Sequence, residues 1–196
     1  PSPRRLEADE VFADDQGAPL LADAQYLLNC PLPEQVVQRD YPELWRYLQR
    51  GVALGIKARY LCAHRSPWYA QEQRPAAPFV CTYMGRQVGA GSRPFRFILN
   101  HSRATAANVY LMLYPREPLK KALIQDPQLK WAIWQALNAI SQHALFAEGR
   151  VYGGGLHKLE PKELGSVPAA AILDIMPRIR LPQPRRQPIQ QPLWEG

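Results

Sequence analysis

The sequence predicts an α+β fold in which a small antiparallel or mixed β-sheet packs with helices. Three apolar runs of strand length, at 79–84, 95–99 and 109–114, are rich in β-branched and aromatic residues and are bounded by Gly, Pro, Asn and Arg. Two other stretches, at 42–52 and 127–148, repeat apolar residues every three or four positions, as one face of a helix does. Short strands together with amphipathic helices indicate the α+β class, with one long helix near 127–148.

The first elements are a strand and a helix. The segment AlaGlnTyrLeuLeuAsn at 24–29 predicts a short strand that leads into a turn at 30–33. A helix follows from Pro42, which suits the first turn, to the region of Gly51. We expect this helix to cover the sheet. Its apolar face is formed by Leu44, Trp45, Leu48 and Val52.

The central and C-terminal elements follow from similar signals. About ten residues separate the runs at 79–84 and 95–99, which favours a hairpin or meander over a crossover helix. The helix at 127–148 stops at Gly149, and its aromatic side chains are expected in the core. Three glycines at 153–155 then predict a flexible link into a short helix. The apolar stripe of the long helix comprises Leu129, Ile133, Trp134, Leu137, Ile140, Ala144 and Leu145.

Length and composition predict one domain over 1–175 followed by an extended tail at 176–196 that is rich in Pro and Arg. Cys30, Cys62 and Cys81 are too few and too irregularly spaced for a disulfide framework, which favours a reducing compartment. No stretch approaches the roughly 20 apolar residues that span a bilayer. We therefore expect a cytoplasmic protein without membrane contact.

The positive charge is concentrated in one part of the chain. From Lys57 to Lys121 there are eleven Lys or Arg residues against Glu72 and Glu117, whereas the whole chain carries only +7. The first thirty residues are acidic. A local basic surface with interleaved aromatic and amide side chains is typical of proteins that neutralise phosphates and read bases.

Several local patterns fit catalytic or metal sites less well than structural roles. Cys62, His64 and Cys81 lack a fourth ligand and a closely spaced Cys pair, so no metal site is expected. The glycines at 153–155 lack the Gly-Lys-Ser/Thr continuation of a P-loop, although they could let a polymer phosphate approach. No local motif suggests a nucleophile with its base. The residues taken alone indicate a protein that recognises nucleic acid and has no catalytic residues.

An ordered series of motifs runs along about residues 25–170. It consists of Arg65-x-Pro-Trp-Tyr69, ValCysThrTyrMetGlyArg86, ArgPheIleLeuAsn100, AlaThrAlaAlaAsnValTyr110 with LeuTyrPro115, and TyrGlyGlyGlyLeuHisLysLeuGluProLysGluLeu164. This series resembles the C-terminal portion of adenine-specific DNA methyltransferases of restriction-modification systems, of the gamma arrangement.

This resemblance implies a target recognition domain that binds double-stranded DNA beside an N-terminal catalytic domain. The S-adenosylmethionine-binding glycine motif and the Asn/Asp-Pro-Pro-Tyr motif of that catalytic domain do not occur in these 196 residues. We therefore expect no cofactor and no enzymatic activity in this chain, and S-adenosylmethionine in the parent enzyme. In such enzymes one domain extrudes the adenine while the other holds and reads the neighbouring sequence.

The candidate DNA-binding residues are arginines beside loops, two asparagines and the glycine-rich segment. A guanidinium can bind either a phosphate or a guanine edge, and an asparagine amide can pair with adenine, although both are also common in ion pairs and strand ends. Trp68 and Tyr69 are assigned to the core. The candidates are Arg65, Arg74, Arg86, Arg93, Arg96, Asn100, Arg103, Asn108, Gly153, Gly154, Gly155, His157 and Lys158.

Two alternatives remain open at this point. The chain could be the specificity domain of a fused restriction endonuclease-methyltransferase. It could also be a stand-alone nucleic-acid-binding or scaffold protein without catalysis, although the aromatic motif of RNA-recognition domains is absent. The segment at 153–158 could equally dock against the catalytic domain.

Overall fold

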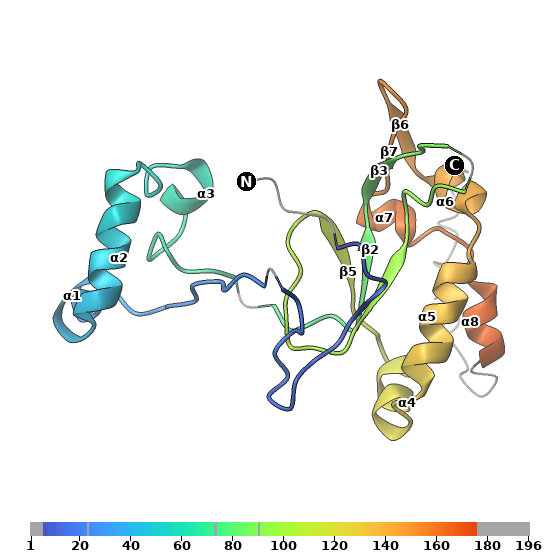
Figure 1. Cartoon of the computed structure of the whole chain (residues 1–196), viewed down its shortest axis with the longest axis horizontal. Helices are drawn as coiled ribbons and strands as arrows, with labels where there is room; N and C mark the ends of the chain where they lie inside the picture. Colours follow the sequence, from blue (N-terminus) through green and yellow to red (C-terminus); the bar gives the residue numbers. More distant parts are fainter. Residues whose placement is uncertain (1–5, 23, 73, 90, 176–196) are drawn as a thin grey trace, which may run out of the picture. The chain divides into compact units, whose positions relative to one another are not determined.

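The computed structural model describes residues 6–22, 24–72, 74–89 and 91–175, which group into two compact units (Figure 1). The helical unit comprises Phe12–Ala76 and Ser102–Thr105. The sheet unit comprises the described parts of Pro1–Val11, Ala77–His101 and Ala106–Gly196. The single recognition domain over 1–175 stays a prediction, and the predicted tail at 176–196 lies outside the described residues.

Three helices build the helical unit: α1 (Glu34–Asp40), α2 (Pro42–Ala53) and α3 (Tyr60–Ala63). The predicted helix from Pro42 is confirmed, with Pro42 in its first turn and Leu48 buried. Its apolar face packs within this unit, which corrects the expectation that the helix packs on the sheet. Leu48 instead packs in a cluster of this unit with Cys30, Val37, Trp68 and Tyr69. The core role predicted for Trp68 and Tyr69 is confirmed.

The strand predicted at 24–29 is wrong. These residues have no regular secondary structure, and the Tyr26 side chain is fully exposed. A strand needs a partner for its backbone groups, and the first strand that has one is β1 (Glu10–Val11). The apolar residues at 24–29 were therefore not enough to predict a strand, because no neighbouring strand pairs with them.

A four-stranded mixed sheet forms the centre of the sheet unit, with the strand order β1-β4-β2-β5. β2 (Phe79–Thr82) pairs antiparallel with both β4 (Phe97–Asn100) and β5 (Tyr110–Leu113), and β1 pairs parallel with β4. All residues of β2 and β4 are buried. The α+β class is confirmed. The three apolar runs supply β2, β4 and β5, although Met84 at the end of the first run already belongs to the second sheet.

Three helices follow β5: α4 (Leu119–Gln125), α5 (Leu129–Ala139) and α6 (Gln142–Glu148). The helical stretch predicted at 127–148 is thus present, but it is two helices and not one. Ile140 is extended, and the side chain of Ser141 accepts a hydrogen bond from the backbone N–H of Ala144, which starts α6 anew. The apolar stripe of both helices packs on Phe79, Phe97 and Leu99 of the sheet.

A second, three-stranded sheet has the order β3-β7-β6. β3 (Met84–Arg86) follows β2, and β6 (Arg150–Tyr152) and β7 (Leu156–Lys158) form an antiparallel hairpin. The glycine triplet is the turn of this hairpin, where a flexible link was expected. The predicted short helix is confirmed as α7 (Pro161–Leu164), and α8 (Ala170–Ile175) lies beside α5 (Figure 1).

Candidate nucleic-acid interface

The candidate DNA-binding residues are distributed over both compact units. Arg65, Arg74 and Arg103 belong to the helical unit, and all the others belong to the sheet unit. Within the sheet unit, Arg86 ends β3 of the second sheet, whereas Arg96 directly precedes β4 of the first.

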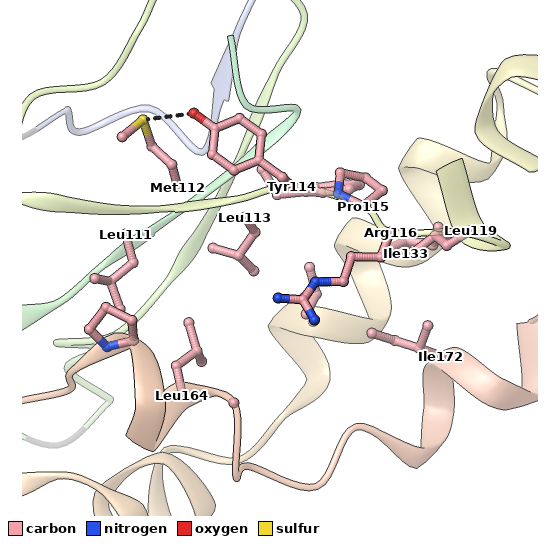
Figure 2. A pocket seen from close by; sticks show the side chains of 14 residues that line it. Leu111, Met112, Leu113, Tyr114, Pro115, Arg116, Leu119, Ile133, Leu164 and Ile172 are labelled. Carbon is pink, nitrogen blue, oxygen red and sulfur yellow. Dashed lines mark hydrogen bonds between the residues drawn. The ribbon is translucent and has the colours of Figure 1, made fainter. Parts of the chain in front are cut away.

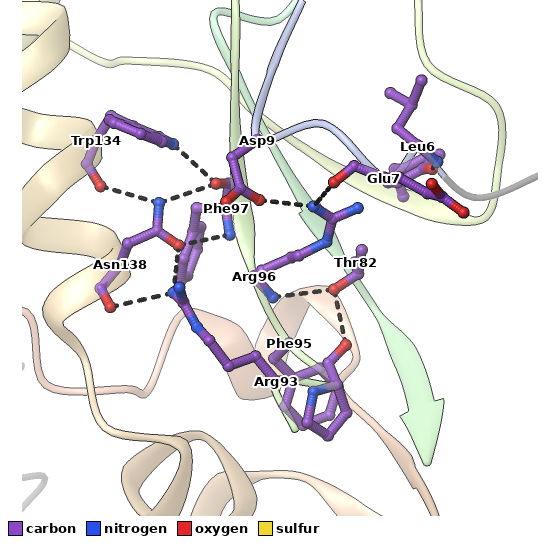
Figure 3. A network of polar contacts seen from close by, with 12 residues as sticks. Leu6, Glu7, Asp9, Thr82, Arg93, Phe95, Arg96, Phe97, Trp134 and Asn138 are labelled. Atoms are coloured by element: carbon purple, nitrogen blue, oxygen red, sulfur yellow. Dashed lines mark hydrogen bonds and ion pairs between the residues drawn. The ribbon is translucent and has the colours of Figure 1, made fainter. Parts of the chain in front are cut away.

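Arg93 and Arg96 are bound by other parts of the sheet unit (Figure 3). The Arg93 guanidinium donates to the side-chain oxygen of Asn138 at 2.8 Å and to its carbonyl at 3.3 Å. Arg96 donates to the carboxylate of Asp9 at 2.6 Å and to the carbonyl of Glu7 at 2.7 Å. The Arg96 side chain is only 18% exposed. Arg93 keeps its net charge because its partners are neutral, whereas Asp9 offsets that of Arg96.

The three arginines of the helical unit also differ in whether a carboxylate offsets their charge. Arg65 donates to the amide oxygen of Gln71 at 2.9 Å, and Arg74 donates to the carboxylate of Glu72 at 2.6 Å. The Arg74 guanidinium lowers the pKa of Glu72. The Arg103 side chain is exposed and lies over Gly17, where a Cβ atom would come within 2.8 Å of its Nε. Arg65 and Arg103 are therefore better placed to meet a phosphate than Arg74 is.

The two asparagines lie in different surroundings. Asn100 is 8% exposed, and its side-chain amide donates to the carbonyl of Ala77 at 3.0 Å. This supports the strand-end role and not the reading of adenine. Asn108 is exposed in the turn before β5.

The glycine-rich segment forms an exposed turn whose flanking residues are held in place. The Arg86 side chain reaches from β3 and donates through Nε to the carbonyl of Gly154 at 3.2 Å. His157 stacks on Phe146, with ring centroids 4.1 Å apart. Lys158 lies 2.5 Å from the carboxylate of Glu160, which raises the pKa of Lys158. Of these side chains, Arg86 is exposed and has a neutral partner.

Cys62, His64 and Cys81 do not form a common site. Cys62 and His64 belong to the helical unit and Cys81 to the sheet unit. Burial raises the pKa of the Cys81 thiol to about 12, which makes it a poor ligand and nucleophile. The described residues contain no group of three or more His, Cys, Asp or Glu side chains that could hold a metal ion.

The sequence did not indicate an apolar pocket of about 470 Å3 in the sheet unit. Its lining comes from β5, α5, α7, α8 and the segments beside them, so no single stretch of sequence reveals it. Figure 2 shows the guanidinium of Arg116 among the apolar side chains of Leu113, Leu164 and Ile172. None of the candidate DNA-binding residues lines this pocket.

Arg150 and Tyr152 were also missed, although both are exposed on the hairpin. Arg150 donates to the carboxylate of Glu163 at 2.6 Å, and this contact raises the pKa of Arg150. The alternation ArgValTyr before the glycine triplet was the available signal, because alternating side chains predict a strand.

Comparison with known proteins gives the class of this α+β chain, which is a methyltransferase C-terminal domain. Residues 12–187 match the model of one family, described as Type II methyltransferase M.Eco57I, C-terminal domain. The chain belongs to this family. The resemblance to the C-terminal portion of methyltransferases is therefore confirmed.

Two curated relatives carry the same kind of name. Type II methyltransferase M.XamI of Xanthomonas campestris pv. amaranthicola is 34% identical over 110 residues, which are 56% of this chain and 18% of that protein. Type II methyltransferase M.AccI of Acinetobacter calcoaceticus is 27% identical over 118 residues, 60% of this chain and 20% of that protein. The chain thus spans about a fifth of the length of each relative.

No solved structure matches the chain significantly. In the described part of the chain, no helix is both long and apolar enough to cross a membrane.

Proposed function

We propose that this chain is the DNA target recognition domain of a site-specific DNA adenine methyltransferase of a restriction-modification system. It would grip duplex DNA and read its sequence, while a separate N-terminal domain binds S-adenosylmethionine and transfers the methyl group. The observation that carries the proposal is the family membership of a chain whose net positive charge is concentrated between Lys57 and Lys121.

The hydrogen-bond and ion-pair partners of the basic side chains favour some of them over others as contacts to DNA. A guanidinium that is bonded to a neutral oxygen keeps its net charge and can turn to a phosphate or a guanine edge. Arg65, Arg86 and Arg93 are in this position, and Arg103 is exposed. A cation that is already paired with a carboxylate loses that attraction if it turns to DNA. Arg74, Arg96, Arg150 and Lys158 are paired in this way.

The proposal predicts DNA binding that depends strongly on salt. Each phosphate that the protein neutralises releases counterions, so affinity falls as salt rises. Fluorescence anisotropy with labelled duplex DNA of mixed sequence, titrated at several salt concentrations, measures this dependence for the chain. Saturable binding at low salt that weakens steadily with added salt supports the proposal. A lack of binding at low salt, or an affinity that salt leaves unchanged, would contradict it.

Recognition of a particular sequence requires the complete enzyme. Sequencing of methylated positions in DNA from cells that express the full-length protein identifies its target. Exchange of this chain for the matching part of a relative with another target should then change the methylated sequence. An unchanged methylation pattern would show that specificity lies in the rest of the protein.

A further inference from the structure

The β3-β7-β6 sheet has two faces of different character. In an antiparallel pair, directly opposite side chains lie on the same face. Arg86 pairs with Leu156, which pairs with Tyr152, while Met84 pairs with Lys158, which pairs with Arg150. One face therefore carries three basic side chains and a tyrosine. Gly85, His157 and Val151 pair in the same way and lie on the other face.

The face with Gly85 and His157 is packed against the rest of the sheet unit. The His157 ring stacks on Phe146 of α6, and a Cβ atom on Gly85 would come within 3.0 Å of the backbone of Pro94. The opposite face is more open, because Arg86, Arg150 and Tyr152 are exposed. The basic face is thus exposed to solvent, whereas on the opposite face only Val151, on the edge strand β6, is exposed.

The net positive charge of this face lies near the turn of the hairpin. At the other end, Arg150 and Lys158 are paired with Glu163 and Glu160. Arg86 is opposite Leu156, next to the turn, and its partner is the uncharged carbonyl of Gly154. An anionic partner is therefore attracted more strongly to the turn than to the base of the hairpin.

Gly153 in this turn is not explained by the chain itself. Gly154 and Gly155 have φ angles of 71° and 68°, which favour glycine. Gly153 does not have a positive φ, and a Cβ atom on it would meet no atom within 4 Å beyond its two chain neighbours. Among the described glycines, the other ten have a positive φ or a neighbour within that distance. A side chain at 153 would therefore extend into solvent, and no contact of the described chain requires glycine there.

We propose that the turn of this hairpin, with Tyr152, Gly153 and Arg86, contacts the sugar-phosphate backbone of duplex DNA. The bare backbone of Gly153 permits close approach, the hydroxyl of Tyr152 donates to a phosphate oxygen, and Arg86 supplies the charge. The inference rests on the proposed function and adds the residues that hold the DNA. A projecting strand pair is suited to this contact, and Figure 1 shows the β6–β7 hairpin extending beyond the neighbouring helix α6.

The test replaces Gly153 by alanine and by leucine and measures binding to labelled duplex DNA of mixed sequence. Both side chains enter open space, so unfolding temperatures should stay at the value of the unchanged chain. Affinity should fall roughly tenfold for Gly153→Leu, about the effect of losing one hydrogen bond to a charged group, and roughly threefold for the smaller side chain of Gly153→Ala. Gly165→Ala, an exposed glycine where a Cβ atom would meet only ordinary contacts from 3.4 Å, is the matched control and should bind normally.

A second variant tests the hydroxyl. Tyr152→Phe keeps the ring and should weaken binding at every salt concentration while leaving the salt dependence unchanged, because the hydroxyl is uncharged and neutralises no phosphate. Arg86→Ala should instead make the salt dependence shallower, because a cation is lost. Normal affinity of the Gly153 and Tyr152 variants, with salt-dependent binding by the unchanged chain, would overturn this inference and leave the proposed function intact. Failure of the unchanged chain to bind DNA would overturn the proposed function itself. Unfolding of Gly153→Ala would also overturn the inference, because the glycine would then serve the fold.

Discussion

Asn138 hydrogen bonds to both backbone groups of Phe97. Its Oδ1 accepts from the Phe97 N–H at 3.1 Å, and its Nδ2 donates to the Phe97 carbonyl at 2.9 Å (Figure 3). β1 pairs with β4 only at Leu99 and Asn100, so the edge of the sheet at Phe97 has no neighbouring strand there. Gln142 binds the backbone of Phe95 in the same way: its Oε1 accepts from the Phe95 N–H at 3.3 Å, and its Nε2 donates to the Phe95 carbonyl at 2.7 Å. Two side-chain amides thus take the place of a neighbouring strand beside Phe95 and Phe97, before the pairing of β1 with β4 begins.

We expect Asn138→Ala to lower the free energy of unfolding by about 1–3 kcal/mol, because the N–H of the buried Phe97 loses its partner. The Phe97 carbonyl keeps a bond from the indole N–H of Trp134 at 2.8 Å, so the loss stays within this range. Denaturant unfolding measures the change. Gln135→Ala, at an exposed position of the same helix, is the control. Equal stability of the two variants would show that the amide of Asn138 contributes little.

Replacement by alanine should have different effects at Arg86 and Arg96, on DNA binding at the first and on stability at the second. Arg96→Ala should lower the free energy of unfolding by about 1–2 kcal/mol, because the bonds to Asp9 and Glu7 are lost. Arg86→Ala should change stability by less than about 0.5 kcal/mol, as is usual for surface positions, and should weaken DNA binding instead. Unfolding curves and DNA titrations of both variants check this, and the reverse pattern would contradict the assignment.

Gly85→Ala should be destabilising by about 1–3 kcal/mol, the usual cost of overpacking. The new methyl group would lie 2.8 Å from Cβ and 3.0 Å from both Cα and the carbonyl oxygen of Pro94, and backbone atoms cannot move aside cheaply. Thermal unfolding measures the loss, with Gly165→Ala as the control. A normal unfolding temperature would mean that β3 shifts away from Pro94 without cost.

Glu163 should contribute stability that is lost in acid. Its side chain accepts from the backbone N–H of Glu160, and this bond, with the ion pair to Arg150, lowers the pKa of Glu163. A carboxyl whose pKa is lower in the folded state stabilises it above the unfolded value, near 4.5, and loses that contribution as pH falls through the folded value.

Glu163→Gln should therefore be less stable than the unchanged chain at neutral pH, and the difference should vanish as the medium becomes acidic. Thermal unfolding over a pH series measures it, with the exposed Glu148→Gln as the comparison. A difference that is independent of pH would show that charge at this position plays no part.

The chain should neither bind S-adenosylmethionine nor methylate DNA by itself, because it lacks the motifs for both. Calorimetric titration with S-adenosylmethionine should give no heat of binding. Saturable binding in the micromolar range would contradict this prediction and would require a cofactor site among the residues of this chain.

The elements that the sequence predicted well are those with a local signal. α2 and the strands β2, β4 and β5 follow from apolar spacing that their own residues carry. β1 has only two residues, and its partner β4 lies almost ninety residues further along the chain. The break between α5 and α6 at Ile140 has no signal in the sequence, because the apolar spacing continues through it from Leu137 to Leu145.

The candidate site was predicted by residue type and not by environment. Arg86, Arg93 and Arg96 look alike in the sequence, yet their partners lie 68, 45 and 87 residues away. Only the tertiary fold determines that Arg86 is exposed beside a neutral carbonyl and Arg96 is paired with Asp9. Tyr152 was missed because the glycine triplet after it was interpreted as a flexible link, which hid the strand.

The amides of Asn138 and Gln142 have a consequence for encounters between molecules. A bare strand edge recruits the strands of other chains, and such edge-to-edge pairing leads to aggregation. At Phe95 and Phe97 the donors and acceptors are already occupied by side chains of the same molecule. Substitution of both amides should therefore expose this strand edge to pairing between molecules. The substituted protein should then aggregate even where its DNA binding is still intact.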